Sequence, residues 1–201
     1  MLTVEQAEQE LEQALRRNPG KWGAHSRSVA DNARLIAERT DGLDPEKAWV
    51  MGLMHDIGRH FGVTGMAHTL DGYDYLMHLG HPEVARICLT HSFPIRDIET
   101  FFGKVDVPPE RIAFLEQFLN SVQYDDYDRL IQLCDAISLP EGACIMEKRL
   151  MDVALRYGFP EGTLEKWTAF LNLKKYFDGL CGCCIYELLP NVMENSCRDL
   201  I

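Results

Sequence analysis

The fold is decided by one stretch, Met51-Gly52-Leu53-Met54-His55-Asp56-Ile57-Gly58-Arg59-His60, in which an apolar run ends in a histidine and an aspartate at adjacent positions. Adjacent helical residues point about 100° apart, because the helix makes one turn in roughly 3.6 residues. His55 and Asp56 therefore cannot both lie deep on one apolar face, but both can reach a single ion beside the end of the helix. An imidazole and a carboxylate together suit iron, manganese, zinc or nickel better than calcium.

Four more side chains of metal-ligand type lie within apolar, helix-like sequence. They are His25, His68, His91 and Asp135. A charged or half-charged group in such surroundings needs a partner, because burying it alone is costly. An isolated His-Asp pair is most often an ordinary helix end, so these four residues are what favours a metal site.

The order of His25, the His55-Asp56 pair and Asp135 resembles the HD-domain superfamily, which is named for its His…His-Asp…Asp signature. The resemblance covers about residues 22–140. It implies an all-α helical bundle and, for most members, metal-dependent phosphohydrolase activity. It is specific for the superfamily but does not identify a substrate.

The chain also resembles the subset of that superfamily with two extra histidines before the last aspartate. In that subset they ligate a second metal ion, which implies His68 and His91 as ligands here, with Asp56 bridging the two ions. Some relatives carry two consecutive histidines where this chain has His91-Ser92. We therefore do not expect their further metal ligand or their cyclic-dinucleotide substrate in this protein.

The first site would be formed by His25, His55, Asp56 and Asp135. Two imidazoles and two carboxylates neutralise a divalent cation and leave positions open for water and substrate. Such an ion acidifies its water and polarises a phosphoryl oxygen, as hydrolysis of a phosphate ester requires. We expect one or two ions of iron, manganese, nickel or zinc, and magnesium is also compatible.

Asp56 and Arg59 are the expected catalytic residues. Arg59 follows the metal-binding pair closely, and its guanidinium group matches the geometry of a phosphate. The resemblance implies the same role, since this position is often Lys or Arg in the family. Arg27, His60 and Arg96 are weaker candidates without a supporting pattern.

The spacing of apolar residues predicts an all-α protein with no strands. Asp44 and Pro45 are typical of a helix start. Gly58, Gly62 and Gly65 predict a loop after the His-Asp pair, and residues 95–107 are expected to form an irregular insertion near the site mouth. The helices are expected at residues 3–16, 22–39, 45–54, 68–79, 82–91, 110–120, 125–138, 144–157 and 161–178.

The chain of 201 residues is long enough for one sizeable core. We expect a single HD-type domain over residues 1–201, with its core at about 22–140. A helical extension at about 141–201 would pack on the metal-binding bundle and end in a polar tail. Substrate specificity is expected to lie in residues 58–67 and 93–107, because loops carry it in most folds.

The formal net charge of −11 argues against a nucleic-acid polymer as partner, since that binding depends on basic patches. No run approaches the roughly 20 apolar residues of a membrane span, and the first residues lack a signal peptide. The seven cysteines are irregularly spaced, which favours reduced thiols in the cytoplasm over disulfides. The roles of Cys181, Cys183 and Cys184 stay open, as does the oligomeric state, for which a homodimer is compatible.

Three functions are compatible with these residues. The first is a phosphohydrolase acting on a small phosphorylated substrate, in particular a nucleotide, through metal-activated water. The second is a mixed-valent di-iron oxygenase, because some HD-fold proteins use the same ligand set for that chemistry. The third is a non-catalytic ligand sensor that keeps its metal. Arg59 favours the hydrolase, and open coordination positions argue against the sensor.

Overall fold

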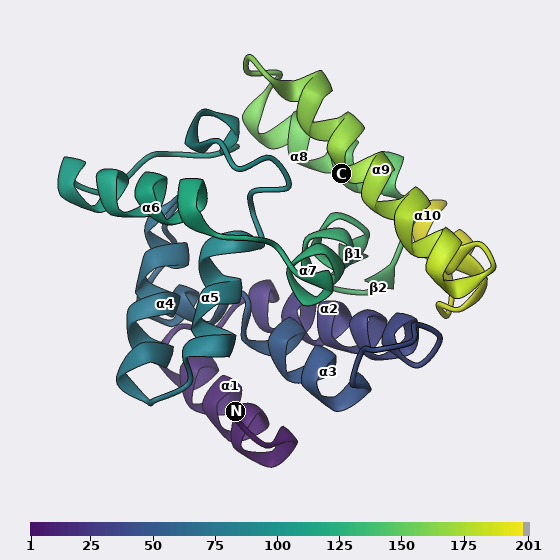
Figure 1. Ribbon diagram of the computed structural model, residues 1–201, viewed down its shortest axis with the longest axis horizontal. Coiled ribbons are helices and arrows are strands. Elements are labelled where there is room, and N and C mark those ends of the chain that lie inside the picture. The colour runs from purple at the N-terminus through teal and green to yellow at the C-terminus, as the bar shows by residue number, and fades with distance from the viewer. Residues whose placement is uncertain (199–201) are drawn as a thin grey trace.

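The computed structural model describes residues 1–198 and is built almost entirely from helices (Figure 1), which confirms the predicted all-α fold. The first half contains α1 (Val4–Arg17), α2 (Lys21–Ala37), α3 (Pro45–Met54), the 3₁₀ helix η1 (Ile57–Phe61), α4 (Ala67–His78) and α5 (Pro82–Thr90). The second half contains η2 (Ile98–Thr100), α6 (Pro109–Ser121), α7 (Asp126–Ala136), β1 (Ser138–Leu139), β2 (Gly142–Ala143), α8 (Met146–Tyr157), α9 (Thr163–Cys181), η3 (Ile185–Glu187) and α10 (Val192–Ser196).

Helices α2 and α3 pack against each other more extensively than any other pair of elements. Helix α1 lies against α3, while α4 and α5 run side by side at one end of the bundle (Figure 1). Helix α7 packs between α2 and α9. This arrangement brings the C-terminal ends of α3, α5 and α7 and the N-terminal ends of α2 and α4 to one region.

The C-terminal helices share a hydrophobic core with the rest of the bundle. Val29 of α2, Ile131 of α7 and Phe177 of α9 belong to one cluster, and each has no solvent-exposed surface. Burying apolar area of this kind is the main favourable term in folding. The helices after residue 141 are therefore packed on the bundle, and α8 and α9 are held beside the end of α7.

The start of α3 follows the chemistry of its sequence. The Asp44 carboxylate accepts a hydrogen bond from the backbone N–H of Lys47 at 2.9 Å, and Pro45 occupies the first helical position. The cap satisfies one of the N–H groups that a helix start leaves unpaired. The predicted start of this helix is confirmed.

Two predictions about local structure need correction. The loop expected at residues 58–65 is confirmed at residues 62–65 but not before them. There η1 forms, because Ile57 is buried and the N–H of Arg59 bonds to the carbonyl of Asp56 at 3.0 Å. A short antiparallel pair also forms where no strand was expected, with Ser138 opposite Ala143. Pro140 and Glu141 form the turn between its strands, and Gly142 follows with a φ of 130°.

The predicted polar tail contains helix α10 instead. Val192 and Asn195 are buried, and the Asn195 amide donates to the carbonyl of Ala143 at 2.9 Å. The end of the predicted extension, residues 199–201, lies outside the described residues.

All seven cysteines are free thiols. Among residues 1–198, no helix is both long and apolar enough to cross a membrane.

Two glycines of the His-Asp stretch allow backbones to approach closely. A Cβ atom on Gly52 would lie 2.7 Å from the Ala30 Cα, where α3 crosses α2. A Cβ atom on Gly58 would meet the carbonyl of His68 and would lie 2.5 Å from the backbone nitrogen of Gly72. These obstacles are backbone atoms, which cannot rotate away. The two glycines therefore set the position of α3 on α2 and of η1 on α4.

We expect Gly58→Ala to destabilise the protein by about 1–3 kcal/mol, because the added methyl group would force η1 away from α4. Urea denaturation measures this change. Gly179→Ala is the matched control, since no atom lies within 4 Å of its added Cβ on α9. The control should be more stable than the wild type by about 0.5–1 kcal/mol, because alanine has a higher helix propensity than glycine. A Gly58→Ala protein as stable as the control would contradict the close approach.

Candidate metal centre

The structure brings all six predicted ligand residues to the region where the helix ends meet. Each lies within five residues of a helix end, and a rigid helix end fixes where a side chain can point. The six are His25 in α2, His55 and Asp56 after α3, His68 in α4, His91 after α5 and Asp135 in α7.

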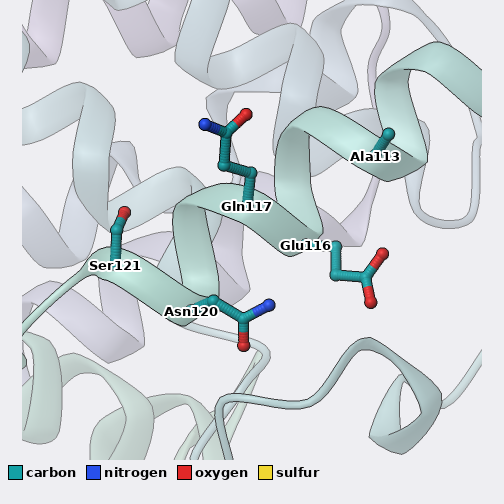
Figure 2. A pocket seen from close by; sticks show the side chains of 5 residues that line it. All are labelled: Ala113, Glu116, Gln117, Asn120 and Ser121. Atoms are coloured by element: carbon teal, nitrogen blue, oxygen red, sulfur yellow. The ribbon is translucent and has the colours of Figure 1, made fainter.

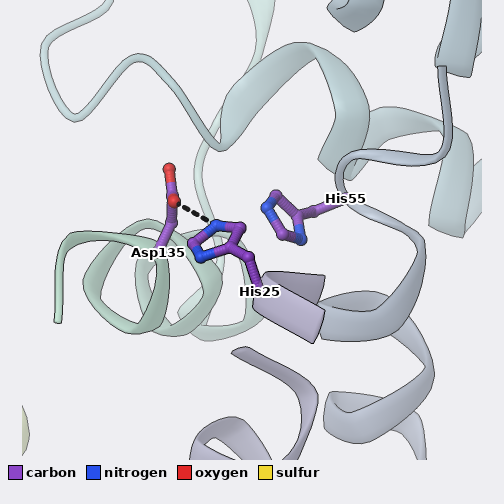
Figure 3. Close-up of side chains that lie close together, drawn as sticks. All are labelled: His25, His55 and Asp135. Carbon is purple, nitrogen blue, oxygen red and sulfur yellow. Dashed lines mark hydrogen bonds and ion pairs between the residues drawn. The ribbon is translucent and has the colours of Figure 1, made fainter. Parts of the chain in front are cut away.

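One group consists of His25, His55 and Asp135 (Figure 3), whose potential ligand atoms all lie within 4.8 Å of one another. The Nε2 atom of His25 lies 3.0 Å from Asp135 Oδ1. The rings of His25 and His55 meet edge to face, with centroids 5.4 Å apart. Three donors at this spacing could hold one metal ion.

A second group consists of His55, Asp56 and His91, also within 4.8 Å. The Oδ1 atom of Asp56 lies 3.2 Å from His68 Nε2 and 3.8 Å from His91 Nε2. Its Oδ2 atom lies 3.8 Å from His55 Nε2. The Asp56 carboxylate therefore faces three imidazoles, as a residue bridging two ions would, and His55 belongs to both groups.

Backbone carbonyls fix the orientation of three imidazoles. His55 Nδ1 donates to the carbonyl of Gly52 at 2.7 Å, and His91 Nδ1 donates to that of Ile87 at 3.2 Å. His68 Nδ1 donates to the carbonyl of Gly65. A carbonyl can only accept, so the proton of each neutral ring lies on Nδ1 and Nε2 keeps its lone pair. This is the arrangement that second-sphere hydrogen bonds give to metal-binding histidines.

Two buried polar atoms of the centre have no hydrogen-bond partner within residues 1–198. They are His55 Nε2 and Asp56 Oδ1. Leaving such atoms unsatisfied costs about 1–3 kcal/mol each in a protein interior. Both atoms carry lone pairs and belong to residues of the second group, so a cation bound by that group could satisfy them. The residues present therefore fit a divalent metal ion.

The protonation states also suit metal binding. Burial alone would raise the pKa of Asp56, but the Arg59 guanidinium beside it holds that pKa well below its usual range. The pKa of Asp135 is likewise lowered by its hydrogen bond to His25, against the effect of burial. Burial lowers the pKa of His25 and lowers that of His91 to about 3. Ionised carboxylates and neutral imidazoles are the forms that bind metals.

Arg59 lies between the ligand residues and solvent. Its Nε atom donates to Asp56 Oδ2 at 2.5 Å, and Nη2 lies 3.5 Å from His68 Nε2. The Asn18 amide donates to the Arg59 carbonyl at 2.6 Å and holds η1 in place. The guanidinium therefore binds a metal-site carboxylate and also lines the adjacent cavity.

Asp106 is a positioning residue that the sequence did not indicate. Its carboxylate accepts hydrogen bonds from the backbone N–H groups of Gly65 at 2.6 Å and Ala67 at 2.9 Å. The N–H of Met66 donates to the carbonyl of Lys104 at 2.8 Å. These bonds fix the turn that precedes His68. No motif marks Asp106, because its role depends on two segments meeting in the fold.

A cavity of about 670 Å³ opens from the candidate metal centre. Ligand-binding cavities commonly have volumes of this order. Its walls come from α2, η1, residues 92 and 101–103, the hairpin, α8 and α9. The wall contains six basic side chains, Lys21, Arg59, Lys148, Arg149, Arg156 and Lys166, and four acidic ones, Asp56, Asp135, Glu141 and Asp152.

Other candidate residues lie away from this cavity. Arg27 pairs with Glu8 at 2.5 Å, and Arg96 donates to the carbonyl of Val122 at 2.7 Å. His60 is buried against Phe61 and Tyr75, outside the cavity wall. The cysteines Cys181, Cys183 and Cys184 do not line it either. A separate hollow on α6, formed by Ala113, Glu116, Gln117, Asn120 and Ser121 (Figure 2), offers a single carboxylate.

The family model of the HD domain matches residues 22–139, which is more than half of the chain. The chain therefore belongs to the HD domain family, as the motif predicted. Members of this superfamily are metal-dependent phosphohydrolases, and HD domains bind divalent metal ions. Searches of curated proteins and of solved structures found no match.

We expect His55→Ala and Asp56→Ala each to remove most bound metal, because each residue faces several other donors of the centre. Elemental analysis of the purified variants by mass spectrometry measures the number of ions per chain. His78→Ala is a control on the exposed end of α4 and should keep the wild-type metal content. Full metal content in both site variants would contradict the assignment.

Proposed function

We propose that the protein is a metal-dependent phosphohydrolase that cleaves a small phosphate ester, in particular a nucleotide. The observation that carries this proposal is the cavity beside the ligand cluster. Six lysine and arginine side chains line it in a chain whose net charge is −11. Basic residues gathered at one place in an acidic protein attract a negatively charged substrate.

The six histidine and aspartate residues are the proposed ligands of one or two divalent ions, which can be iron, manganese, nickel, zinc or magnesium. Bound metal would lower the pKa of a water molecule and polarise a phosphoryl oxygen. The buried Asp56 stays ionised, and its carboxylate faces three imidazoles whose orientation is fixed by backbone carbonyls. The low exposure of the centre strengthens its electrostatic interactions, because few water molecules screen them.

Arg59 is the proposed contact to the phosphoryl group being hydrolysed. Its Nε atom donates to Asp56 and its Nη2 atom lies 3.5 Å from His68 Nε2, so Nη1 is the nitrogen left to donate to a phosphate oxygen. The side chain lines the cavity while it stays attached to a ligand residue. This position would fix the phosphoryl group relative to the ions, and such positioning is a large part of catalysis in phosphoryl transfer.

The proposal is tested by restoring the native metal and screening phosphate compounds without oxygen. Elemental analysis of the protein as purified identifies that metal. We expect phosphate release under anaerobic conditions, because hydrolysis needs no oxidant. A product that forms only with oxygen would identify an oxygenase instead. No turnover across a broad panel with the metal fully loaded would identify a ligand sensor.

We expect Arg59→Ala to raise KM for the phosphate substrate about tenfold or more while the metal stays bound. The removed guanidinium contacts substrate but is not a proposed metal ligand. Steady-state kinetics with parallel metal analysis measures both quantities. Arg27→Ala is a matched control, because this arginine pairs with Glu8 outside the cavity. An unchanged KM in Arg59→Ala would remove this residue from the substrate site.

A further inference from the structure

Lys166 is a buried cation that the proposed hydrolysis does not use. It lies in α9 with 5% of its surface exposed, and it lines the cavity. Its ammonium group donates to the carbonyl of Thr100 at 2.9 Å and lies over the ring of Phe102, 4.4 Å from the centroid. Within residues 1–198 it forms no ion pair. Burial lowers the pKa of Lys166 to about 8, which the field of Asp135 offsets only in part.

A buried cation without a carboxylate partner is costly, because it gives up hydration without a compensating charge. Lys174, the next lysine along α9, has such a partner, since its ammonium group lies 2.6 Å from the Asp178 carboxylate. A neutral donor could serve the carbonyl of Thr100 equally well. Apart from its contact with the Phe102 ring, the positive charge of Lys166 has no partner of opposite charge among residues 1–198, and it faces a space large enough for a ligand.

The neighbouring helix α8 adds two arginines whose charge is partly neutralised, and the Nη2 atom of one of them, Arg149, lies 3.8 Å from Asp135 Oδ1. Asp152 is shared by two guanidinium groups, at 2.8 Å from Arg149 Nη1 and 2.6 Å from Arg156 Nη2. The Nε atom of Arg149 is buried without a hydrogen-bond partner among the described residues. Both arginines line the same cavity as Lys166. The C-terminal helices thus give this wall more positive than negative charge.

We propose that Lys166, together with Arg149 and Arg156, forms a second anion subsite that binds a phosphoryl group other than the one hydrolysed. The substrate then carries at least two phosphoryl groups. Arg59 and the metal ligands can already bind a single phosphoryl group. The positive charge of this wall, which Asp152 and Asp135 neutralise only in part, is therefore available for a second one. This inference rests on the proposed phosphohydrolase function in one respect, namely which of the two phosphoryl groups is cleaved.

The size and lining of the cavity support a substrate with an organic part. About 670 Å³ exceeds what inorganic phosphate fills. Phe101, Phe102 and Phe170 line the cavity together with the cations. Apolar walls beside a charged group exclude water and strengthen its attraction for an anion. Planar rings on the ligand could stack on these aromatic side chains.

The test measures binding to the metal-loaded, full-length protein by calorimetry. The probes are adenosine monophosphate and the α,β-methylene analogue of adenosine diphosphate, which resists cleavage between its phosphorus atoms. We expect the wild type to bind the diphosphate analogue at least about tenfold more tightly, because the second phosphoryl group gains charge-assisted hydrogen bonds. Lys166→Met should remove most of this difference and leave the affinity for the monophosphate within about twofold.

Three further variants make the outcome specific. Lys166→Arg should keep the preference, since it keeps the charge. Lys175→Met changes an exposed lysine of the same helix and should behave like the wild type. Arg156→Gln changes a half-exposed cation of the subsite and should reduce the preference for the diphosphate analogue over the monophosphate. This variant also tests the subsite if Lys166→Met does not fold.

The proposal is overturned if the wild type shows no preference for the diphosphate analogue. It is also overturned if Lys166→Met weakens the binding of both ligands equally, because that result would mean that Lys166 only holds residues 100–102 in place. Binding requires no turnover. A protein that shows the preference but hydrolyses no phosphate compound would refute the proposed function and leave the subsite standing.

Discussion

The carboxylate of Asp56 is the constraint on which the rest of the site depends. It is buried and carries a negative charge, and it faces Arg59 at 2.5 Å and the imidazoles of His55, His68 and His91 at 3.2–3.8 Å. These groups come from separate elements, so a single charge dictates how the ends of α3, η1, α4 and α5 meet. A carboxylate this deeply buried is stable only while its partners stay in place.

The helical bundle makes that convergence possible because it permits unusually close backbone contacts. Gly52 allows α3 to cross α2, and Gly58 allows η1 to lie on α4. Ligands at the ends of packed helices are held more precisely than ligands on loops. The Asp106 carboxylate adds a further restraint by holding the turn before His68. The centre is thus built from rigid parts, while the cavity wall comes from later segments of the chain.

The sequence predicted the parts of the site that carry local signals. Adjacent His55 and Asp56 after an apolar run, and ligand types within apolar helices, were sufficient to find residues that the fold brings together. The basic wall formed by Arg149 and Lys166 was missed, because an arginine or lysine in an amphipathic helix looks the same whether it faces solvent or a cavity. Asp106 was missed for a related reason, since its partners are distant in sequence.

The most direct test of this account is X-ray absorption spectroscopy of the metal-loaded protein. We expect a first coordination sphere of imidazole nitrogen and carboxylate or water oxygen, without sulfur. With two ions bound, a metal–metal distance of about 3.5–4 Å is expected, because Asp56 would bridge them. A sulfur-containing sphere would place the metal at the cysteines instead. Such a result, or a protein that binds no metal, would contradict the central claim.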